Sequence, residues 1–138
     1  MFKFKKIEYD DLNARQKEAF NFQKVSAVLA DYGFITIWLS SDWNGADFIA
    51  QHCDGHTFLK VQLKGRLGFK KKYRDCDLYI CFRDPDDGEC YLYLHNELRR
   101  KVLAMNKMRG TVAWEQKGVY HFPKIPGTLR GLLEPYRL

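Results

Sequence analysis

The stretch ADFIAQHCDGHTFLKVQLKGR, residues 46–66, decides how the sheet of this chain is built. Asp54-Gly55 separates two apolar segments, ADFIAQ and TFLKVQLKG, and this dipeptide favours a tight hairpin turn. A two-residue turn makes Cys53 face His56, so the numbers of facing residues sum to 109. A symmetric lengthening of the loop keeps this sum, whereas a bulge shifts it. Asp47 is therefore expected to face Gln62.

Three polar side chains are expected to share one face of this hairpin. Opposed residues have Cβ atoms about 4.5–5.5 Å apart, and Gln62 and Lys64 lie on the same face because strand side chains alternate. A carboxylate, an amide oxygen and an ammonium together suit a hard divalent ion next to a group that orients water or stabilises phosphate charge. A solvated polar face with a weak Asp47–Lys64 ion pair explains the same spacing. Spacing alone does not choose between the two.

The other elements follow from periodicity and turn residues. A helix is expected over residues 13–31, with Asn13 as its N-cap and Gly33 as its stop. Strands are expected over 34–39, 77–82 and 90–94, a polar turn over 40–45 and a second helix over 95–105, followed by a tail with at most one short strand. This order predicts a single α/β domain, residues 1–138, with a mixed sheet.

Glu18 is a second acid of interest. It lies four residues before Phe22 and therefore on the apolar face of the first helix, where an acid is unusual. A solvated acid favoured by the helix dipole is the simpler interpretation.

Composition limits the class of protein. A net charge of +6 and a pI near 9.1 favour a polyanionic partner such as nucleic acid. No segment approaches the roughly 18 consecutive apolar residues of a membrane span, and the start MFKFKKIEYDD lacks the apolar middle of a secretory signal. We therefore expect a soluble, cytoplasmic protein.

Residues 14–84 resemble the PD-(D/E)xK nuclease superfamily, which includes archaeal Holliday-junction resolvases and certain restriction, homing and transposon-end endonucleases. The matching features are Glu18 in the first helix, YGF closing that helix, GADFIA in place of xPDxxx, and VQLK in place of (D/E)xK. Asp47 follows Glu18 by twenty-nine residues, and Gln62 follows Asp47 by fifteen. The sequence departs from the pattern at Ala46, which replaces proline, and at Gln62, which replaces an acid, as in some transposon-end nucleases.

This resemblance implies a restriction-endonuclease-like core and Mg²⁺-dependent hydrolysis of DNA phosphodiester bonds, with Mn²⁺ as a substitute. It implies that Asp47 is the principal metal ligand, assisted by Gln62, Glu18 and the backbone carbonyl of Leu63. Lys64 is then expected to orient the attacking water or to stabilise charge on the phosphorus.

The segment KGRLGFKKKYR follows the expected catalytic strand and is the candidate DNA-binding surface. Its cations can contact phosphates or can simply form a solvated loop: Arg66, Lys70, Lys71, Lys72 and Arg74. Trp43 and Asn44, in the turn before Asp47, are further candidates for DNA contact, although core or turn packing is the simpler interpretation of the tryptophan.

Three functions are therefore compared. The first is an endonuclease of the homing, restriction or junction-resolving type. It is expected to be a homodimer or a higher symmetric oligomer, because cutting both strands usually needs two active centres. The second is a catalytically inactive DNA-binding module, which Gln62 makes plausible. The third is an interaction protein without nucleic-acid binding.

Overall fold

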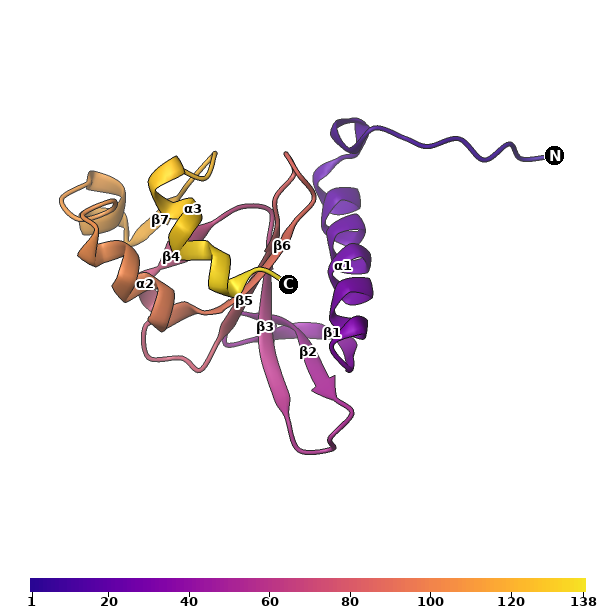
Figure 1. Cartoon of the computed structure of the whole chain (residues 1–138), viewed down its shortest axis with the longest axis horizontal. Coiled ribbons are helices and arrows are strands. Elements are labelled where there is room, and N and C mark those ends of the chain that lie inside the picture. The colour runs from indigo at the N-terminus through magenta and orange to yellow at the C-terminus, as the bar shows by residue number, and fades with distance from the viewer.

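A five-stranded mixed sheet forms the centre of the computed structural model, which describes residues 1–138 (Figure 1). The strand order is β1-β2-β3-β5-β6. The strands are β1 Phe34–Trp43, β2 Ala46–His52, β3 Phe58–Lys64, β5 Tyr79–Arg83 and β6 Cys90–Leu94. β3 and β5 are parallel, and the other neighbours are antiparallel. The sequence-based prediction of an α/β domain with a mixed sheet is therefore confirmed.

Helix α1, Ala14–Asp31, begins and ends where the sequence indicates. The Asn13 side chain accepts the backbone N–H of Gln16 at 2.9 Å, and the Gln16 side chain accepts the N–H of Asn13 at 2.9 Å. This capping box satisfies two N–H groups that an α-helix leaves free at its start. Gly33 follows the helix with a φ of 85°, a left-handed conformation that glycine adopts without strain.

The two faces of the sheet are covered by different layers (Figure 1). α1 packs on one face, where Val25 and Leu29 join Phe48, Val61 and Cys81 in a buried cluster. The opposite face carries the larger cluster, which includes Ile80, Phe82, Leu98 and Leu129. Its cover consists of α2 His95–Ala104, α3 Gly127–Leu133 and the small sheet of β4 Gly68–Lys70 with β7 Val119–His121. Four short helical turns complete the chain, Tyr9–Asp11, Lys71–Tyr73, Ala113–Lys117 and Glu134–Tyr136. No helix combines the length and the apolar character that crossing a bilayer requires.

The β2–β3 hairpin has the expected register. Phe48 pairs with Val61 and Gln51 with Phe58, so facing residue numbers sum to 109. The expected two-residue turn is wrong, however, because the loop closes one pair earlier, through the N–H of His52 and the carbonyl of Thr57 at 2.9 Å. The lengthening is symmetric, so Asp47 still lies opposite Gln62.

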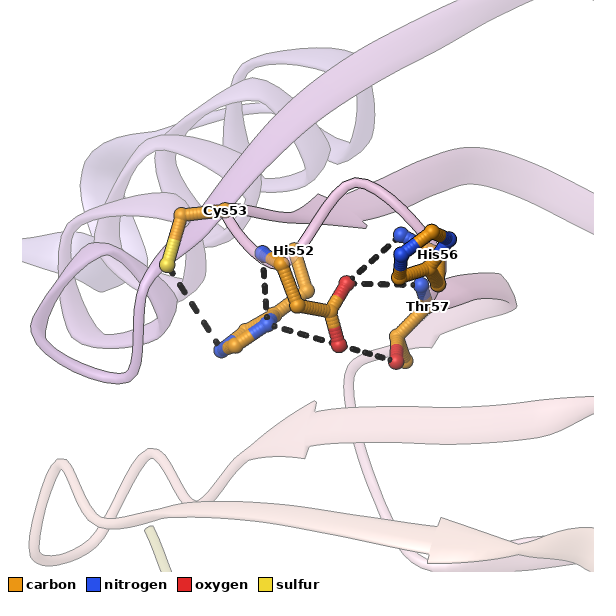
Figure 2. Close-up of polar contacts among 5 residues, drawn as sticks. His52, Cys53, His56 and Thr57 are labelled. Carbon is orange, nitrogen blue, oxygen red and sulfur yellow. Dashed lines mark hydrogen bonds and ion pairs between the residues drawn. The ribbon is translucent and has the colours of Figure 1, made fainter.

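The side chain of Asp54 explains the longer loop. Its carboxylate accepts the N–H groups of His56 and Thr57, each at 2.8 Å, and the Thr57 hydroxyl at 2.6 Å. The Asp54 carboxylate lies between the side chains of His52 and Thr57 at the hairpin tip (Figure 2). The hydrogen bonds to this carboxylate also hold the pKa of Asp54 well below its ordinary value. A side chain that bonds its own backbone thus replaces the tight turn.

Two other expectations differ from the structure. β1 continues to Trp43 rather than ending at residue 39, and its pairing with β2 is irregular between Trp38 and Trp43. Only Asn44 and Gly45 remain as the turn, where the Asp42 side chain accepts the N–H of Gly45 at 2.8 Å. The tail also contains α3, whose Leu129 and Leu133 are buried despite the proline and glycine residues around it.

Candidate active site

Asp47 and Gln62 line one polar cleft at the end of the β2–β3 pair. Asp47 precedes Phe48, the first residue of β2 that pairs with β3, and Gln62 follows Val61, the partner of Phe48. The cleft has a volume of about 290 Å³, enough for a hydrated ion, and Asp42 and Tyr73 also line it. The structure therefore brings together the two central residues that the sequence predicts.

Asp47 is half-buried and tied to the neighbouring strand. Its Oδ2 accepts the backbone N–H of Leu63 at 2.8 Å. Burial raises the pKa of its carboxyl, the N–H of Leu63 and the charge of Lys64 lower it, and the charges of Glu18 and Asp42 raise it further. The net direction is upward. A cation in the cleft would stabilise the charged form of this carboxylate.

Gln62 carries a buried acceptor without a partner. Its side chain is only 6% exposed, and its Nε2 donates to the Tyr73 hydroxyl at 3.0 Å. Its Oε1 has no hydrogen-bond partner in the protein. An unsatisfied buried polar atom costs about 1–3 kcal/mol, so each one calls for a physical explanation. In this cleft the oxygen is free to serve as a ligand beside a carboxylate.

Lys64 and Glu18 lie in a neighbouring hollow of about 310 Å³, which Leu63 also lines. Burial lowers the pKa of the Lys64 ammonium, the charge of Lys70 lowers it further, and Asp47 opposes the shift. Glu18 is exposed and comes from α1, which covers the opposite face of the sheet. Its charge nevertheless raises the pKa of Asp47, so the two acids are within electrostatic range. The four predicted residues thus occupy adjoining hollows rather than one cleft.

Two candidate functional residues, Tyr73 and Asn21, were not predicted from the sequence. Tyr73 reaches Gln62 from the segment read only as basic, and nothing in its spacing points to this contact. Asn21 lies in the same hollow as Glu18, is only 4% exposed, and donates its Nδ2 to the Tyr9 hydroxyl at 2.9 Å. Its Oδ1 is also without a partner. The spacing of three residues from Glu18, which places both on one helix face, was the available signal.

The predicted DNA-binding cations are not a simple loop. Lys70 ends β4, and Lys71 and Lys72 begin the next helical turn. Arg66, Lys72 and Arg74 are exposed, whereas Lys71 is half-buried, with its Nζ 5.1 Å from the centre of the Trp114 ring and 3.8 Å from Glu115. Arg74 is paired with Asp75, at 3.6 Å between Nε and Oδ2, so the free phosphate-binding capacity lies mainly with Arg66 and Lys72.

Trp43 and Asn44 lie at the tip of the β1–β2 turn. Trp43 is 62% exposed, so it does not serve the core, and Asn44 has a φ of 53°. Both line a separate hollow that includes Lys60 and Asp75. Their position leaves them accessible to a partner but outside the Asp47–Gln62 cleft.

No group of three His, Cys, Asp or Glu side chains gathers in an arrangement that holds a metal ion. A cation at Asp47 would therefore depend on amide and backbone oxygens as well as carboxylates. Such mixed oxygen ligands suit hard ions such as Mg²⁺.

Comparison with known proteins relates the fold to nucleases. No family model matches the chain, and no curated protein matches its sequence. The bacterial homing endonuclease I-Ssp6803I superposes with a TM-score of 0.54 at 13% identity, covering 91% of this chain and 86% of that one. Hjc, a Holliday junction resolvase from Archaeoglobus fulgidus, gives a TM-score of 0.39 at 16% identity, covering 52% and 74%. Together with the N-terminal helix and the five-stranded mixed sheet, the first superposition shows that the chain has a restriction-endonuclease-like fold.

Proposed function

We propose that this protein is a metal-dependent endonuclease that hydrolyses DNA phosphodiester bonds. The observation that carries the proposal is the buried, unpartnered Oε1 of Gln62 in the cleft of Asp47. Oxygen ligands from an acid and an amide suit Mg²⁺, or Mn²⁺ in its place.

The residues present fit such an ion. Asp47 supplies the charged ligand and Gln62 the neutral one. The N–H of Leu63 already points to Asp47, and the N–H and C=O of one strand residue point to the same side, so its carbonyl is available as a further oxygen. Glu18, in the adjoining hollow, can contribute directly or through water. When bound, the ion supplies Lewis acidity, which lowers the pKa of a water and offsets negative charge on phosphate.

Lys64 provides the remaining group. It follows Gln62 by two residues on β3, so both side chains lie on the same face of the strand. Its ammonium lies within electrostatic range of Asp47 and lines the same hollow as Glu18, so it can hydrogen-bond the attacking water or a phosphate oxygen. The place of Lys64 on a regular strand supports this role, because a strand limits the movement of the side chain's base.

The proposal includes DNA as the substrate and a symmetric oligomer as the assembly. Arg66, Lys72 and Arg74 are exposed close to the end of β3, and their charges suit a phosphate backbone that leads into the cleft. Trp43 and Asn44 extend this surface from the β1–β2 turn. One chain has one such cleft, so cutting both strands of a duplex calls for a homodimer or a higher symmetric oligomer.

A second candidate is a DNA-binding module that has kept the fold without the chemistry. The uncharged Gln62 favours it, because an amide binds a divalent cation less strongly than a carboxylate does. The exposed cations around the cleft serve this function equally well.

Cleavage of supercoiled plasmid separates the candidates. The endonuclease nicks the plasmid with Mg²⁺ or Mn²⁺, and Asp47→Ala abolishes nicking while leaving DNA binding largely intact. Asp31→Ala, at the exposed C-terminal end of α1, is the matched control and should cut normally. DNA binding without cleavage of duplex, branched or single-stranded substrates would favour the inactive module. DNA binding that is absent at low salt would exclude both.

A further inference from the structure

The amide of Gln62 can be placed in two ways, and only one of them serves a cation. An amide has an oxygen that accepts and a nitrogen that donates, so exchanging the two ends replaces a metal ligand by a repelling N–H group. In the structure Nε2 donates to the Tyr73 hydroxyl at 3.0 Å, and Oε1 is the end without a partner. Because the two ends have nearly the same shape, the end that bonds Tyr73 determines which end faces the cleft.

We infer that Tyr73 is a positioning residue that presents the Gln62 oxygen to the cation, an inference that rests on the proposed function. A reversed amide would bring Nε2 toward the side of the cleft where the Asp47 carboxylate can accept it. That contact would occupy both protein ligands at once. The Tyr73 hydroxyl can donate or accept, and in the orientation that serves the cation it accepts from Nε2, which would otherwise be a buried donor without a partner.

The absence of a side chain at Gly45 leaves the space that the Tyr73 ring occupies. A Cβ atom at this position would lie 2.6 Å from Cε1 and 2.8 Å from Cζ of Tyr73, closer than real carbon atoms approach. The φ of Gly45 is 90°, which side-chain-bearing residues rarely adopt. The turn before Asp47 thus admits the ring directly beside the site.

The remaining contacts hold the ring independently of its hydroxyl. Tyr73 is only 7% exposed, and His95 packs against it edge to face with ring centres 5.9 Å apart. The ammonium groups of Lys70 and Lys72 lie 5.8 and 4.9 Å from the ring centre. Attraction of these cations to the ring does not need the hydroxyl. Replacing tyrosine with phenylalanine should therefore remove the hydrogen bond and keep the packing.

The dependence on Tyr73 should be specific to glutamine. A carboxylate at position 62 has two acceptor oxygens and no donor, so neither orientation blocks a cation. Gln62→Glu should consequently free the site from its need for the tyrosine hydroxyl.

The test measures Mn²⁺ affinity directly, without DNA, by electron paramagnetic resonance of the free ion. It compares the wild type, Tyr73→Phe, Gln62→Glu and the double variant. Tyr73→Phe should weaken Mn²⁺ binding about tenfold in the glutamine background, the equivalent of one hydrogen bond of ordinary strength, and less than about threefold in the glutamate background. Tyr136→Phe is the control, because it removes a hydroxyl that donates to Glu97 of α2 at 2.6 Å and does not line the cleft. It should bind Mn²⁺ as the wild type does.

Equal affinity of wild type and Tyr73→Phe would overturn this inference and leave the proposed function intact. An equal loss in both backgrounds would also overturn it, since Tyr73 would then support only the shape of the cleft. A wild type that binds no Mn²⁺ would overturn the proposed function together with the inference. Should Tyr73→Phe lose its thermal unfolding transition, Gly45→Ala displaces the same ring, and its loss of Mn²⁺ affinity should likewise shrink in the glutamate background.

Discussion

The backbone N–H of Leu63 donates to Oδ2 of Asp47 at 2.8 Å, at the place where β2 and β3 stop pairing. The backbone pairing of β2 and β3 ends at Phe48 and Val61, and this bond extends the hydrogen bonding between the strands with a side-chain oxygen. It also aims the carboxylate at the cleft that Gln62 shares. The structural role of Asp47 and its proposed catalytic role are therefore separable by mutation.

Asp47→Asn and Asp47→Ala should differ in stability but not in activity. The asparagine keeps an oxygen that can accept the Leu63 N–H, whereas alanine leaves that group unpaired. Without metal, Asp47→Ala should be less stable than Asp47→Asn by about 1 kcal/mol, the usual net value of one hydrogen bond. Both variants should cut DNA about a thousandfold more slowly or worse, because each removes the charge of the proposed metal ligand. Urea unfolding and plasmid nicking measure the two effects. Equal stability of the two variants would mean that water replaces the carboxylate oxygen at Leu63.

Asp47 should also make the metal-free protein less stable as the pH rises. Burial raises the pKa of this carboxyl above its ordinary value of 3.8, so the folded protein holds the proton more tightly than the unfolded chain does. The resulting stability is fully present below 3.8 and is lost as the pH rises through the folded pKa. Asp47→Asn does not titrate, so its advantage over the wild type should grow with pH across this window. Urea unfolding at several pH values, in chelator, measures the difference. An advantage that stays constant with pH would contradict the raised pKa.

His95 should make the protein less stable as the pH falls, which is the opposite dependence to that of Asp47. It is fully buried, and burial lowers its pKa to about 4 from an ordinary value of 6.5. Its Nε2 accepts the N–H of Lys70 at 3.2 Å, so the neutral ring supports β4. As the pH falls below 6.5, the unfolded chain takes up the proton first, and stability falls until the folded pKa is passed. The loss should be about 3 kcal/mol in all, at 1.36 kcal/mol for each pKa unit.

His95→Gln can replace the same acceptor without titrating. Its unfolding free energy should therefore depend less on pH than that of the wild type between 6.5 and 4. Urea unfolding at fixed pH values tests this. Parallel curves for the two proteins would show that the buried ring does not carry the acid sensitivity.

The sequence predicts the parts of this structure that depend on local chemistry and periodicity. Asn13 and Gly33 bound α1, and the hairpin register followed from the position of Asp54-Gly55, although the side chain of Asp54 lengthened the loop. Glu18, by contrast, lies in an adjoining hollow because its helix covers the other face of the sheet, a matter of packing between layers that no spacing encodes.

Tyr73 is a second residue whose place in the site depends on packing that sequence spacing does not encode. Its contact with Gln62 spans eleven residues and depends on β4 and a helical turn folding back across the end of β3. In the sequence it is one aromatic residue in a basic segment. α3 was missed for a related reason, since burial of Leu129 and Leu133 stabilises a helix that its glycine residues disfavour.

The exposed cations beyond β3 should contribute unequally to DNA affinity. Lys72→Gln and Arg66→Gln remove exposed charges, whereas Lys71→Gln removes one already held by Trp114 and Glu115. Removing a lysine or arginine that binds one phosphate should lower the slope of log affinity against log salt by about 0.9 on duplex DNA. Fluorescence anisotropy in the Asp47→Asn background, without metal, isolates binding from cleavage. Lys24→Gln, an exposed lysine of α1, is the control and should leave the slope unchanged. If Lys71→Gln instead reduces the slope most, the DNA must displace Lys71 from Glu115, and the binding surface lies nearer to β7 than to the Asp47 cleft.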